Sequence, residues 1–371
     1  MSSEFGKILR IGVFGQSHGR AVGVRMDGLP AGEPLDLEEL QRFLDRRAPG
    51  RNTQSTARRE ADQPVFLSGL EGGRTCGAPL CAIIENTDPR SEDYEELLDK
   101  PRPSHADYTA WVKWKGRADM RGGGHFSGRL TAPVVAAGAI CRQILSAHGV
   151  RLATRIARCG GIADAPLPTD AAVLAAAVSA LEGMPFPVLD AAAGEAMKAR
   201  IAHAKSGLDS VGGVLETVVL GLEAGLGEPW FDAVESELAH LLFAVPGVKG
   251  VEFGAGFAIA ELTGSAANDP FAFDAHGGVC TTTNHSGGVQ GGITNGMPVL
   301  FRTAVKPTPS IYRSQQTVDL AAGTPAVLAL KGRHDPAIVH RARAVVDAVT
   351  AFGLVDLAAV RHGTDWMAQQ L

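Results

Sequence analysis

The chain has 371 residues, of which 45% are hydrophobic, and its formal net charge is −5 at pH 7. This length allows a large buried core and suggests two or three structural units. The acidic balance argues against a nucleic-acid-binding protein, because such domains are usually basic.

The sequence also indicates where the protein works. Its longest apolar stretch, residues 132–141, is shorter than the roughly 18 residues that a membrane-spanning helix needs. The N-terminus lacks the apolar region of a secretory signal, so we expect a cytoplasmic protein. Five cysteines without paired ligand spacing predict reduced thiols and no metal site.

Apolar periodicity predicts an α+β protein. In chain order we expect strands over residues 9–14, 22–26, 65–67, 80–84, 215–220, 257–262 and 299–305. We expect helices over residues 36–48, 132–140, 170–181, 191–204, 231–242 and 336–352. Asp36 is the expected N-cap of the first helix, and Asp335 followed by Pro336 is typical of the start of the last. No long polar linker occurs, so we expect one compact unit over residues 1–371.

One turn sequence occurs twice. The pattern Gly-Leu-x-Ala-Gly, followed by Glu-Pro, stands at residues 28–34 and again at 221–229, each time between an expected strand and an expected helix. Two such copies suggest a duplicated unit and a pseudo-symmetric core, although two similar turns also arise by chance.

Glycine is the compositional outlier, at 45 of 371 residues, or about 12% against a typical 7%. Residues 121–129 (Arg-Gly-Gly-Gly-His-Phe-Ser-Gly-Arg) precede an expected helix, and anions bind well at a helix N-terminus. Such a turn also occurs without a ligand, so the segment alone leaves both readings open. A second glycine-rich loop spans residues 283–296 and matches no common nucleotide-binding motif.

Several side chains have the chemistry of a site. His18 follows the first expected strand, and His105 has Asp107 two residues later, which could orient the ring. Asp335 stands beside an arginine and a histidine and could act as a base. Lys306 and the hydroxyls that follow it could hold a phosphate. Five clustered arginines predict binding of phosphate or carboxylate, although a solvated surface is the usual setting for such clusters; they are Arg46, Arg47, Arg51, Arg58 and Arg59.

Taken together, these segments resemble the chorismate synthase family from about residue 12 to residue 363. The matching motifs are Gly-Gln-Ser-His-Gly (15–19), Leu-Asp-Arg-Arg-x-Pro-Gly (44–50), Glu-Asn-Thr-Asp (85–88), Arg-Pro-x-His-Ala-Asp-Tyr-Thr (102–109), Arg-Gly-Gly-Gly (121–124), Gly-Leu-Gly-Glu-Pro (225–229), Val-Lys-Gly-Val-Glu (248–252), the loop at 283–296, Lys-Pro-Thr (306–308) and Gly-Arg-His-Asp-Pro (332–336).

The resemblance implies a fold, an activity and a cofactor. The fold would be a βαβ sandwich with internal pseudo-symmetry, assembled as a homotetramer. The activity would be the 1,4-anti elimination of phosphate from 5-enolpyruvylshikimate 3-phosphate to give chorismate, which requires reduced FMN without net oxidation. Reduced FMN would come from the protein itself, with NADPH as electron donor, or from a separate flavin reductase, and the sequence leaves both open.

The resemblance also implies roles for single residues. His18 would donate a proton near substrate and flavin, His105 would lie near flavin N1, and Asp335 would assist proton transfer at flavin N5. Substrate anions would be bound by Arg46, Arg47, Arg51 and Arg129. FMN would be bound by His125, Phe126, Ser127, Pro246, Gly247, Gly291, Lys306, Pro307, Thr308, Pro309, Ser310 and Arg333.

The chain departs from the family pattern near three of these segments. Gln16 replaces a glutamate beside His18, His125 replaces an arginine after the three glycines, and Leu130 replaces a polar residue. Thr53 replaces an arginine that Arg51 could compensate. Two alternatives therefore stay open: a paralogue acting on a related phosphate, and a flavin- or metabolite-binding homologue without turnover. A protonated His125 that replaced the arginine would bind FMN less tightly as the pH rises.

Overall fold

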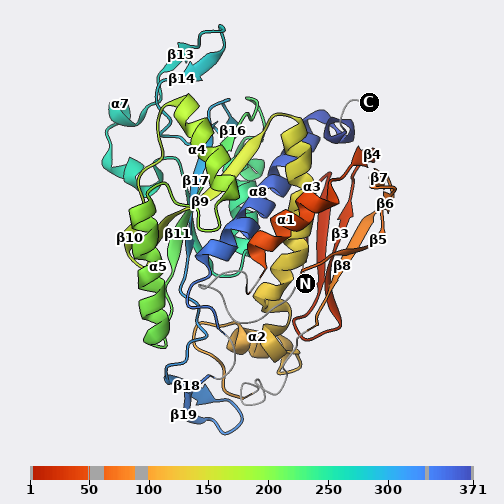
Figure 1. Cartoon of the computed structure of the whole chain (residues 1–371), viewed down its shortest axis with the longest axis vertical. Coiled ribbons are helices and arrows are strands. Elements are labelled where there is room, and N and C mark those ends of the chain that lie inside the picture. Colours follow the sequence, from red (N-terminus) through yellow and green to blue (C-terminus); the bar gives the residue numbers. More distant parts are fainter. Residues whose placement is uncertain (1–2, 49, 51–61, 88–98, 331–333, 369–371) are drawn as a thin grey trace.

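A computed structural model describes residues 3–48, 50, 62–87, 99–330 and 334–368 of the protein. Two five-stranded antiparallel sheets enclose a layer of helices (Figure 1). The first sheet has the order β1 (Glu4–Phe5), β2 (Arg10–Gly15), β3 (Ala21–Asp27), β8 (Leu80–Glu85) and β5 (Val65–Ser68). The second has the order β10 (Ile162–Ala163), β9 (Arg151–Cys159), β11 (Gly213–Leu220), β17 (Val299–Val305) and β12 (Val248–Phe253).

The central layer consists of α1 (Leu37–Arg47), α3 (Thr131–Ala147), α6 (Val234–Ala244) and α8 (Val339–His362). Helix α3 packs on α8 and also contacts β2, β3 and β8, whereas α8 contacts β9 and β11 of the other sheet. Almost every side chain of α8 up to Ala359 is buried, including the charged Arg343, Asp347 and Asp356, because other elements pack around the helix on all sides. The α+β class and the βαβ sandwich are thus confirmed.

The two central helices approach closely at a glycine. A Cβ added to Gly138 of α3 would lie 2.3 Å from the Cβ and 2.4 Å from the Cα of Ala348 in α8. The first turns of both helices line the cavity described below. The spacing between α3 and α8 therefore sets the position of two sides of that cavity.

Smaller elements cover the outside. Helix α4 (Ala171–Gly183) packs on the outer face of the second sheet, and α5 (Ala191–Ser206) lies beside β10. The remaining helices are α2 (Asp107–Trp114), α7 (Gly264–Ala267) and the 3₁₀ segments η2 (Arg121–Phe126), η3 (Gly128–Leu130), η4 (Trp230–Asp232), η5 (Gly256–Glu261) and η6 (Thr364–Met367). The remaining strands are β4 (Ala31–Pro34), β6 (Leu70–Glu71), β7 (Arg74–Cys76), β13 (Phe271–Phe273), β14 (Val279–Thr281), β15 (Val289–Gln290), β16 (Ile293–Thr294), β18 (Gln315–Asp319) and β19 (Thr324–Leu328).

The repeated turn has the predicted structural context. Residues 28–34 connect β3 to α1, and residues 221–229 connect β11 to α6. Helices α1 and α6 both pack against α8. The two strand–turn–helix units thus belong to opposite sheets and share one central helix, as a duplicated unit would. Buried residues of both sheets and of the central helices form one hydrophobic cluster; the assignment of residues 1–371 to a single domain remains a prediction.

Two predictions of local structure are wrong. The run at 257–262 is not a strand but mostly the 3₁₀ helix η5, because Gly254 and Gly256 at φ +54° and +59° turn the chain away from β12. Helix α8 begins at Val339 and not at Pro336, and its N-cap is Ile338. Asp335 consequently caps no helix and instead pairs with Arg341. The N-cap role of Asp36 is confirmed by bonds to its carboxylate from the backbone N–H groups of residues 38 and 39.

The two ends of the described chain are tied together. The backbone N–H of Lys7 donates to Oδ2 of Asp356 at 2.8 Å, and those of Ile8 and Leu9 donate to Oδ1 at 2.9 Å. Asp356 lies in α8 and is buried. A side chain near the C-terminus thus satisfies three backbone donors that precede β2.

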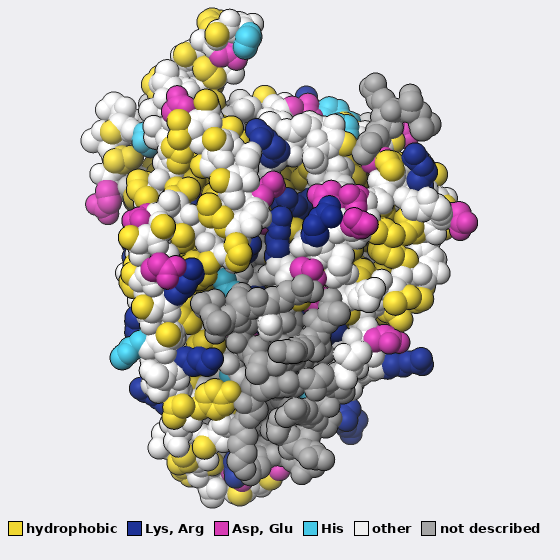
Figure 2. Space-filling view, viewed as in Figure 1, with side chains coloured by type: hydrophobic (Ala, Val, Ile, Leu, Met, Phe, Trp, Pro, Cys, Tyr) yellow, Lys and Arg dark blue, Asp and Glu magenta, His cyan; other side chains and the backbone are white. Residues whose placement is uncertain are grey.

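Helical residues 121–147 are long and apolar enough to cross a membrane by composition alone, but 72% of the relevant window is buried inside the protein. Left-handed glycines at 122–124 also interrupt this stretch. It is therefore a core helix preceded by a loop. Hydrophobic side chains gather elsewhere on the surface, over the outer strands of the first sheet, where Val65 and Leu67 are exposed (Figure 2).

Candidate active site

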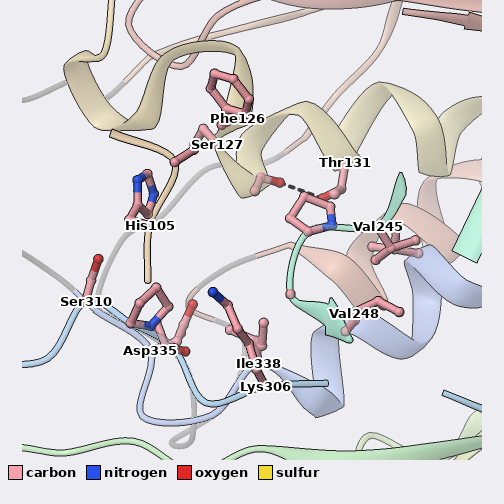
Figure 3. Close-up of a pocket in the computed structure, with 18 of the residues that line it drawn as sticks. His105, Phe126, Ser127, Thr131, Val245, Val248, Lys306, Ser310, Asp335 and Ile338 are labelled. Carbon is pink, nitrogen blue, oxygen red and sulfur yellow. Dashed lines mark hydrogen bonds between the residues drawn. The ribbon is translucent and has the colours of Figure 1, made fainter. Parts of the chain in front are cut away.

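A cavity of about 680 Å³ lies at the N-terminal ends of α3 and α8. Its lining comes from five segments of the described chain: 102–106, 122–131, 243–249, 306–310 and 334–345, together with Arg47. Figure 3 shows His105, Lys306, Ser310 and Asp335 gathered on one side of the cavity, and Val245 and Val248 on another. The site thus combines polar groups from several loops with an apolar wall, as is typical of small-molecule sites.

The glycine-rich segment adopts a backbone that requires glycine. Gly122, Gly123 and Gly124 have φ values of +60°, +89° and +55°. A Cβ on Gly124 would lie 2.0 Å from the Asp119 carbonyl oxygen. The chain then passes through η3 into α3, where Thr131 Oγ1 donates to the Gly128 carbonyl at 2.6 Å. The predicted placement of this loop before a helix is confirmed.

The cavity is suited to anions. Two helix N-termini, those of α3 and α8, meet there and contribute partial positive charge. Asp335 is the one acidic side chain among the described residues that line it. The cationic side chains of the lining are Arg47, Arg102, Arg129, Lys249, Lys306 and Arg341.

Lys306 shows how closely these cations are packed. Its Nζ donates to the Ser104 carbonyl at 2.5 Å. Burial, and then the nearby charge of Lys249, lowers the pKa of Lys306 from its ordinary value. A bound anion would relieve this repulsion, because it would stabilise both ammonium groups.

Arg47 and Arg129 converge on one carboxylate. Both are buried, and both donate to Asp62, which is itself buried. Arg129 also donates to the Asn86 side chain at 2.9 Å and to a backbone carbonyl at 2.9 Å. Asp62 therefore compensates two cations at the cavity wall. No sequence signal pointed to Asp62, because its role depends on two residues 15 and 67 positions away.

His105 is oriented by a buried ion pair. Its Nδ1 lies 2.8 Å from Asp107 Oδ1, and Arg102 donates to both oxygens of the same carboxylate at 2.7 Å. Burial alone would raise the pKa of Asp107, but the hydrogen bonds from Arg102 and His105 hold it well below its usual range. The predicted orienting role of Asp107 thus agrees with the geometry, and Arg102 fixes the carboxylate in turn.

Asp335 is held in a similar way. Arg341 donates to its Oδ2 at 2.5 Å and, through Nε, to the Arg47 carbonyl at 2.8 Å. Next to Arg341 in α8, His340 is buried, and burial followed by the charge of Arg341 lowers its pKa to about 4. Arg341 in the first turn of α8 therefore positions the Asp335 carboxylate at the cavity, although Asp335 does not cap that helix.

Comparison with known proteins identifies the family. The family model described as chorismate synthase matches residues 9–359. The chorismate synthase of Thermococcus kodakarensis is 45% identical over 364 residues, covering 98% of this chain and 99% of the relative. The chain belongs to the chorismate synthase family. The chorismate synthase of Dehalococcoides mccartyi is 46% identical to this chain, over 96% of this chain and 97% of the relative. A crystal structure of a chorismate synthase matches with a TM-score of 0.76 at 27% identity, over 97% of this chain and 94% of that one.

Most residues to which the family resemblance gives a role lie at the cavity. The lining includes His105, Asp335, Arg47, Arg129, His125, Phe126, Ser127, Pro246, Gly247, Lys306, Pro307, Thr308, Pro309 and Ser310. His18 is not part of the lining, but it lies against Gly122, which is. Arg51 and Arg333 lie outside the described residues, as do Thr53, Arg58 and Arg59.

Two of the predicted residues are placed elsewhere. The guanidinium of Arg46 lies 5.3 Å from the centre of the Phe43 ring, on the side of α1 that faces Arg142 of α3. Adjacent residues of a helix point in different directions, so Arg46 does not share the position of Arg47 at the cavity. Gly291 lies in the turn between β15 and β16 and does not line the cavity. Lys249, to which no role was predicted, does line the cavity; its place in the Val-Lys-Gly-Val-Glu motif (248–252) is the sequence signal that points to it.

His125 is engaged within the protein. Its Nδ1 lies 2.8 Å from the Gly15 carbonyl and its Nε2 lies 3.0 Å from Ser3 Oγ. A hydrogen on Nδ1 satisfies the carbonyl, and the hydroxyl then donates to Nε2. The residue that replaces the family arginine therefore binds the first strands to the glycine-rich loop, and neither ring nitrogen is directed at an external anion.

The cavity has polar and apolar groups that suit FMN. Thr308 Oγ1 is buried and has no hydrogen-bond partner among the described residues, so it offers a polar contact to a ligand. Lys306 and Ser310 stand beside it, and Gly247 has φ +95°, where a side chain would be strained. Hydroxyls, an ammonium group and open backbone suit a phosphate, and the Val245 and Val248 wall suits a planar ring. The residues present fit the cofactor.

Proposed function

We propose that the protein catalyses the chorismate synthase reaction, the elimination of phosphate from 5-enolpyruvylshikimate 3-phosphate to chorismate. The C–O bond to phosphate and a ring C–H bond break, and a new ring double bond forms. The observation that carries the proposal is the cavity with six cationic side chains and one carboxylate, in a chain whose family match covers residues 9–359. The substrate has two carboxylates and a phosphate, which such a cavity would bind.

The chain's own residues would bind the substrate and handle protons. Arg47, Arg129 and Lys249 would hold its anionic groups; the two arginines are buried, whereas Lys249 is exposed. His105, fixed by Asp107, presents one imidazole edge in a defined orientation. Asp335, whose carboxylate accepts a hydrogen bond from Arg341, would act as the proton acceptor.

FMN would be held by the residues around Thr308 and by the segment at 125–127. When bound and reduced it supplies electron density to the reacting ring. Two sources of reduced FMN remain alternatives: the protein reduces FMN itself with NADPH, or a separate reductase supplies it. Turnover with NADPH and oxidised FMN alone would favour reduction by the protein itself.

A single assay tests the proposed function. The purified protein is incubated anaerobically with reduced FMN and 5-enolpyruvylshikimate 3-phosphate, and phosphate and chorismate are measured. We expect equal amounts of both. Substrate binding without turnover would indicate a non-catalytic homologue, and inertness would indicate a paralogue. His18→Ala and Asp335→Ala should depress kcat far more than they raise KM, whereas unchanged turnover in either variant would refute the role of that residue.

We further infer that the protein works in the cytoplasm as a homotetramer. The exposed apolar side chains of β5 support association, because Val65 and Leu67 are 48% and 59% exposed on the face of a sheet. Light scattering coupled to size exclusion measures the assembly directly, and a monomer at micromolar concentration would contradict it.

A further inference from the structure

The three glycines before α3 bring two histidines to one stretch of backbone. An ideal Cβ on Gly122 would lie 2.1 Å from Cε1 and 2.2 Å from Nδ1 of His18. On Gly123 it would lie 3.5 Å from Cε1 of His105. Both ring nitrogens of His18 are shielded from solvent. The imidazole of His18 therefore lies directly against the loop backbone, where charge on neighbouring side chains acts strongly.

Asp119 brings a negative charge to the turn that carries His18. Gln16 donates from Nε2 to Asp119 Oδ2 at 2.7 Å. Arg121 donates from Nε to Oδ1 at 2.9 Å and from a terminal nitrogen to Oδ2 at 2.8 Å. The carboxylate is thus held from two directions: by the turn that carries His18 and by the loop that packs on it.

The electrostatics of Asp119 point to His18. Hydrogen bonds from Arg121 are the largest cause that lowers the pKa of the Asp119 carboxyl, and the charge of His18 lowers it further. Such attraction is mutual, so the same carboxylate favours the protonated form of the imidazole.

We propose that Asp119 is a positioning residue for His18: its carboxylate, held by Gln16 and Arg121, stabilises the imidazolium from which His18 donates a proton. Residue 16 of this chain is a glutamine, whose side chain is an uncharged amide. An amide donates, so in this chain residue 16 orients the carboxylate and Asp119 supplies the charge. The inference rests on the proposed role of His18 as a proton donor.

Other charged or titratable groups surround the same turn. His105 lies across Gly123, and His125 contacts the Gly15 carbonyl. Arg129 reaches the turn through Asn86, which donates to the carbonyls of residues 16 and 19. These groups, when charged, oppose a protonated His18. Arg121 opposes it less, because its side chain is 49% exposed and solvent screens it. Asp119 is placed to counter them.

The test measures the protonation of His18 directly. The protein is labelled with ¹³C at histidine Cε1, the His18 signal is assigned by its loss in His18→Gln, and its shift is followed by NMR from pH 5 to 9. In Asp119→Asn the titration midpoint should fall by about half to one pH unit, a three- to tenfold change in the protonation constant. In Arg121→Gln it should rise, because a cation next to the carboxylate is removed.

Activity provides a second readout. In Asp119→Asn the kcat against pH profile should move to lower pH with little change in KM, and Asp119→Glu should restore much of it. An unchanged His18 midpoint in Asp119→Asn, in a variant with wild-type thermal stability, would overturn the inference. The role of His18 and the proposed function fail separately: turnover in His18→Ala would show that His18 is not the proton donor, and absence of chorismate with the wild-type protein would refute the proposed function.

Discussion

The contact between Gly138 and Ala348 gives a quantitative test of the packing between α3 and α8. In Gly138→Ala the new Cβ would lie 2.3–2.4 Å from the Cβ and Cα of Ala348, and Cα is backbone that no rotamer change can move. Overpacking of this kind costs about 1–3 kcal/mol or more. Replacing a glycine inside a helix contributes about 1 kcal/mol in the opposite direction. Because the clash is with backbone, the cost lies at the upper end of that range, about 3 kcal/mol, and the expected net loss is about 2 kcal/mol.

Gly353 of α8 provides a matched control. It also lies inside a central helix, but a Cβ there would meet only the ends of two leucine side chains, at 2.8 Å from Leu241 and 3.1 Å from Leu238. Those ends can shift, so the gain in helix propensity should offset most of the cost. We expect Gly353→Ala to lie within about 0.5 kcal/mol of wild type.

Urea unfolding followed by circular dichroism, at equal protein concentration, measures the stability of both variants. A shift of the unfolding midpoint at unchanged slope gives the change in the free energy of unfolding. If Gly138→Ala were as stable as Gly353→Ala, the close approach of the two helices would be refuted. Because the first turns of both helices line the cavity, we also expect a weaker FMN complex in Gly138→Ala only.

Three further predictions concern buried charge. Asp62→Asn leaves two buried arginines uncompensated and should lower the free energy of unfolding in urea by about 3–5 kcal/mol. Asp27→Asn, which removes a surface ion pair, is the control and should lower it by under about 1 kcal/mol. Equal losses of stability in the two variants would contradict the buried position of Asp62. His340 is neutral when folded, with a pKa of about 4 against about 6.5 unfolded, so the unfolded chain binds the extra proton and stability falls as the pH drops from 6.5 towards 4. His340→Gln should remove up to about 3 kcal/mol of that dependence, and an unaltered stability–pH curve would refute it. The pKa of Asp107 is depressed, so its contribution is present above the unfolded value near 4 and lost below it; Asp107→Asn should therefore destabilise the protein at pH 7 and progressively less as the pH falls below 4 in thermal melts.

Local patterns in the sequence predicted much of the fold. The strands at 9–14, 22–26 and 299–305 and the cap at Asp36 depend on neighbouring residues, and the structure has them. The strand predicted at 257–262 is wrong because a short apolar run fits a strand and a helix equally well. Asp335 misled because aspartate before proline favours a helix start, yet its ion pair with Arg341 places it at the cavity instead.

The site was less accessible to sequence reasoning than the fold. The glycine-rich loop and Lys306 were found because they are local signals, and the cavity contains both. Asp62 and Asp119 were missed, because their partners lie up to 103 positions away and only the fold brings them together. Arg46 was included because it adjoins Arg47 in sequence, although helix geometry turns the two apart.

The bonds from Lys7, Ile8 and Leu9 to Asp356 have a consequence for biosynthesis. At about 5–20 residues per second, the ribosome adds residue 356 roughly 20–70 s after the first strand emerges. During that time the N-terminal segment lacks the carboxylate that satisfies its backbone, and α3 and α1 lack the central helix α8 on which they pack. The native fold therefore forms only after residue 356 has been made, and we expect the emerging first sheet to be the segment that chaperones protect.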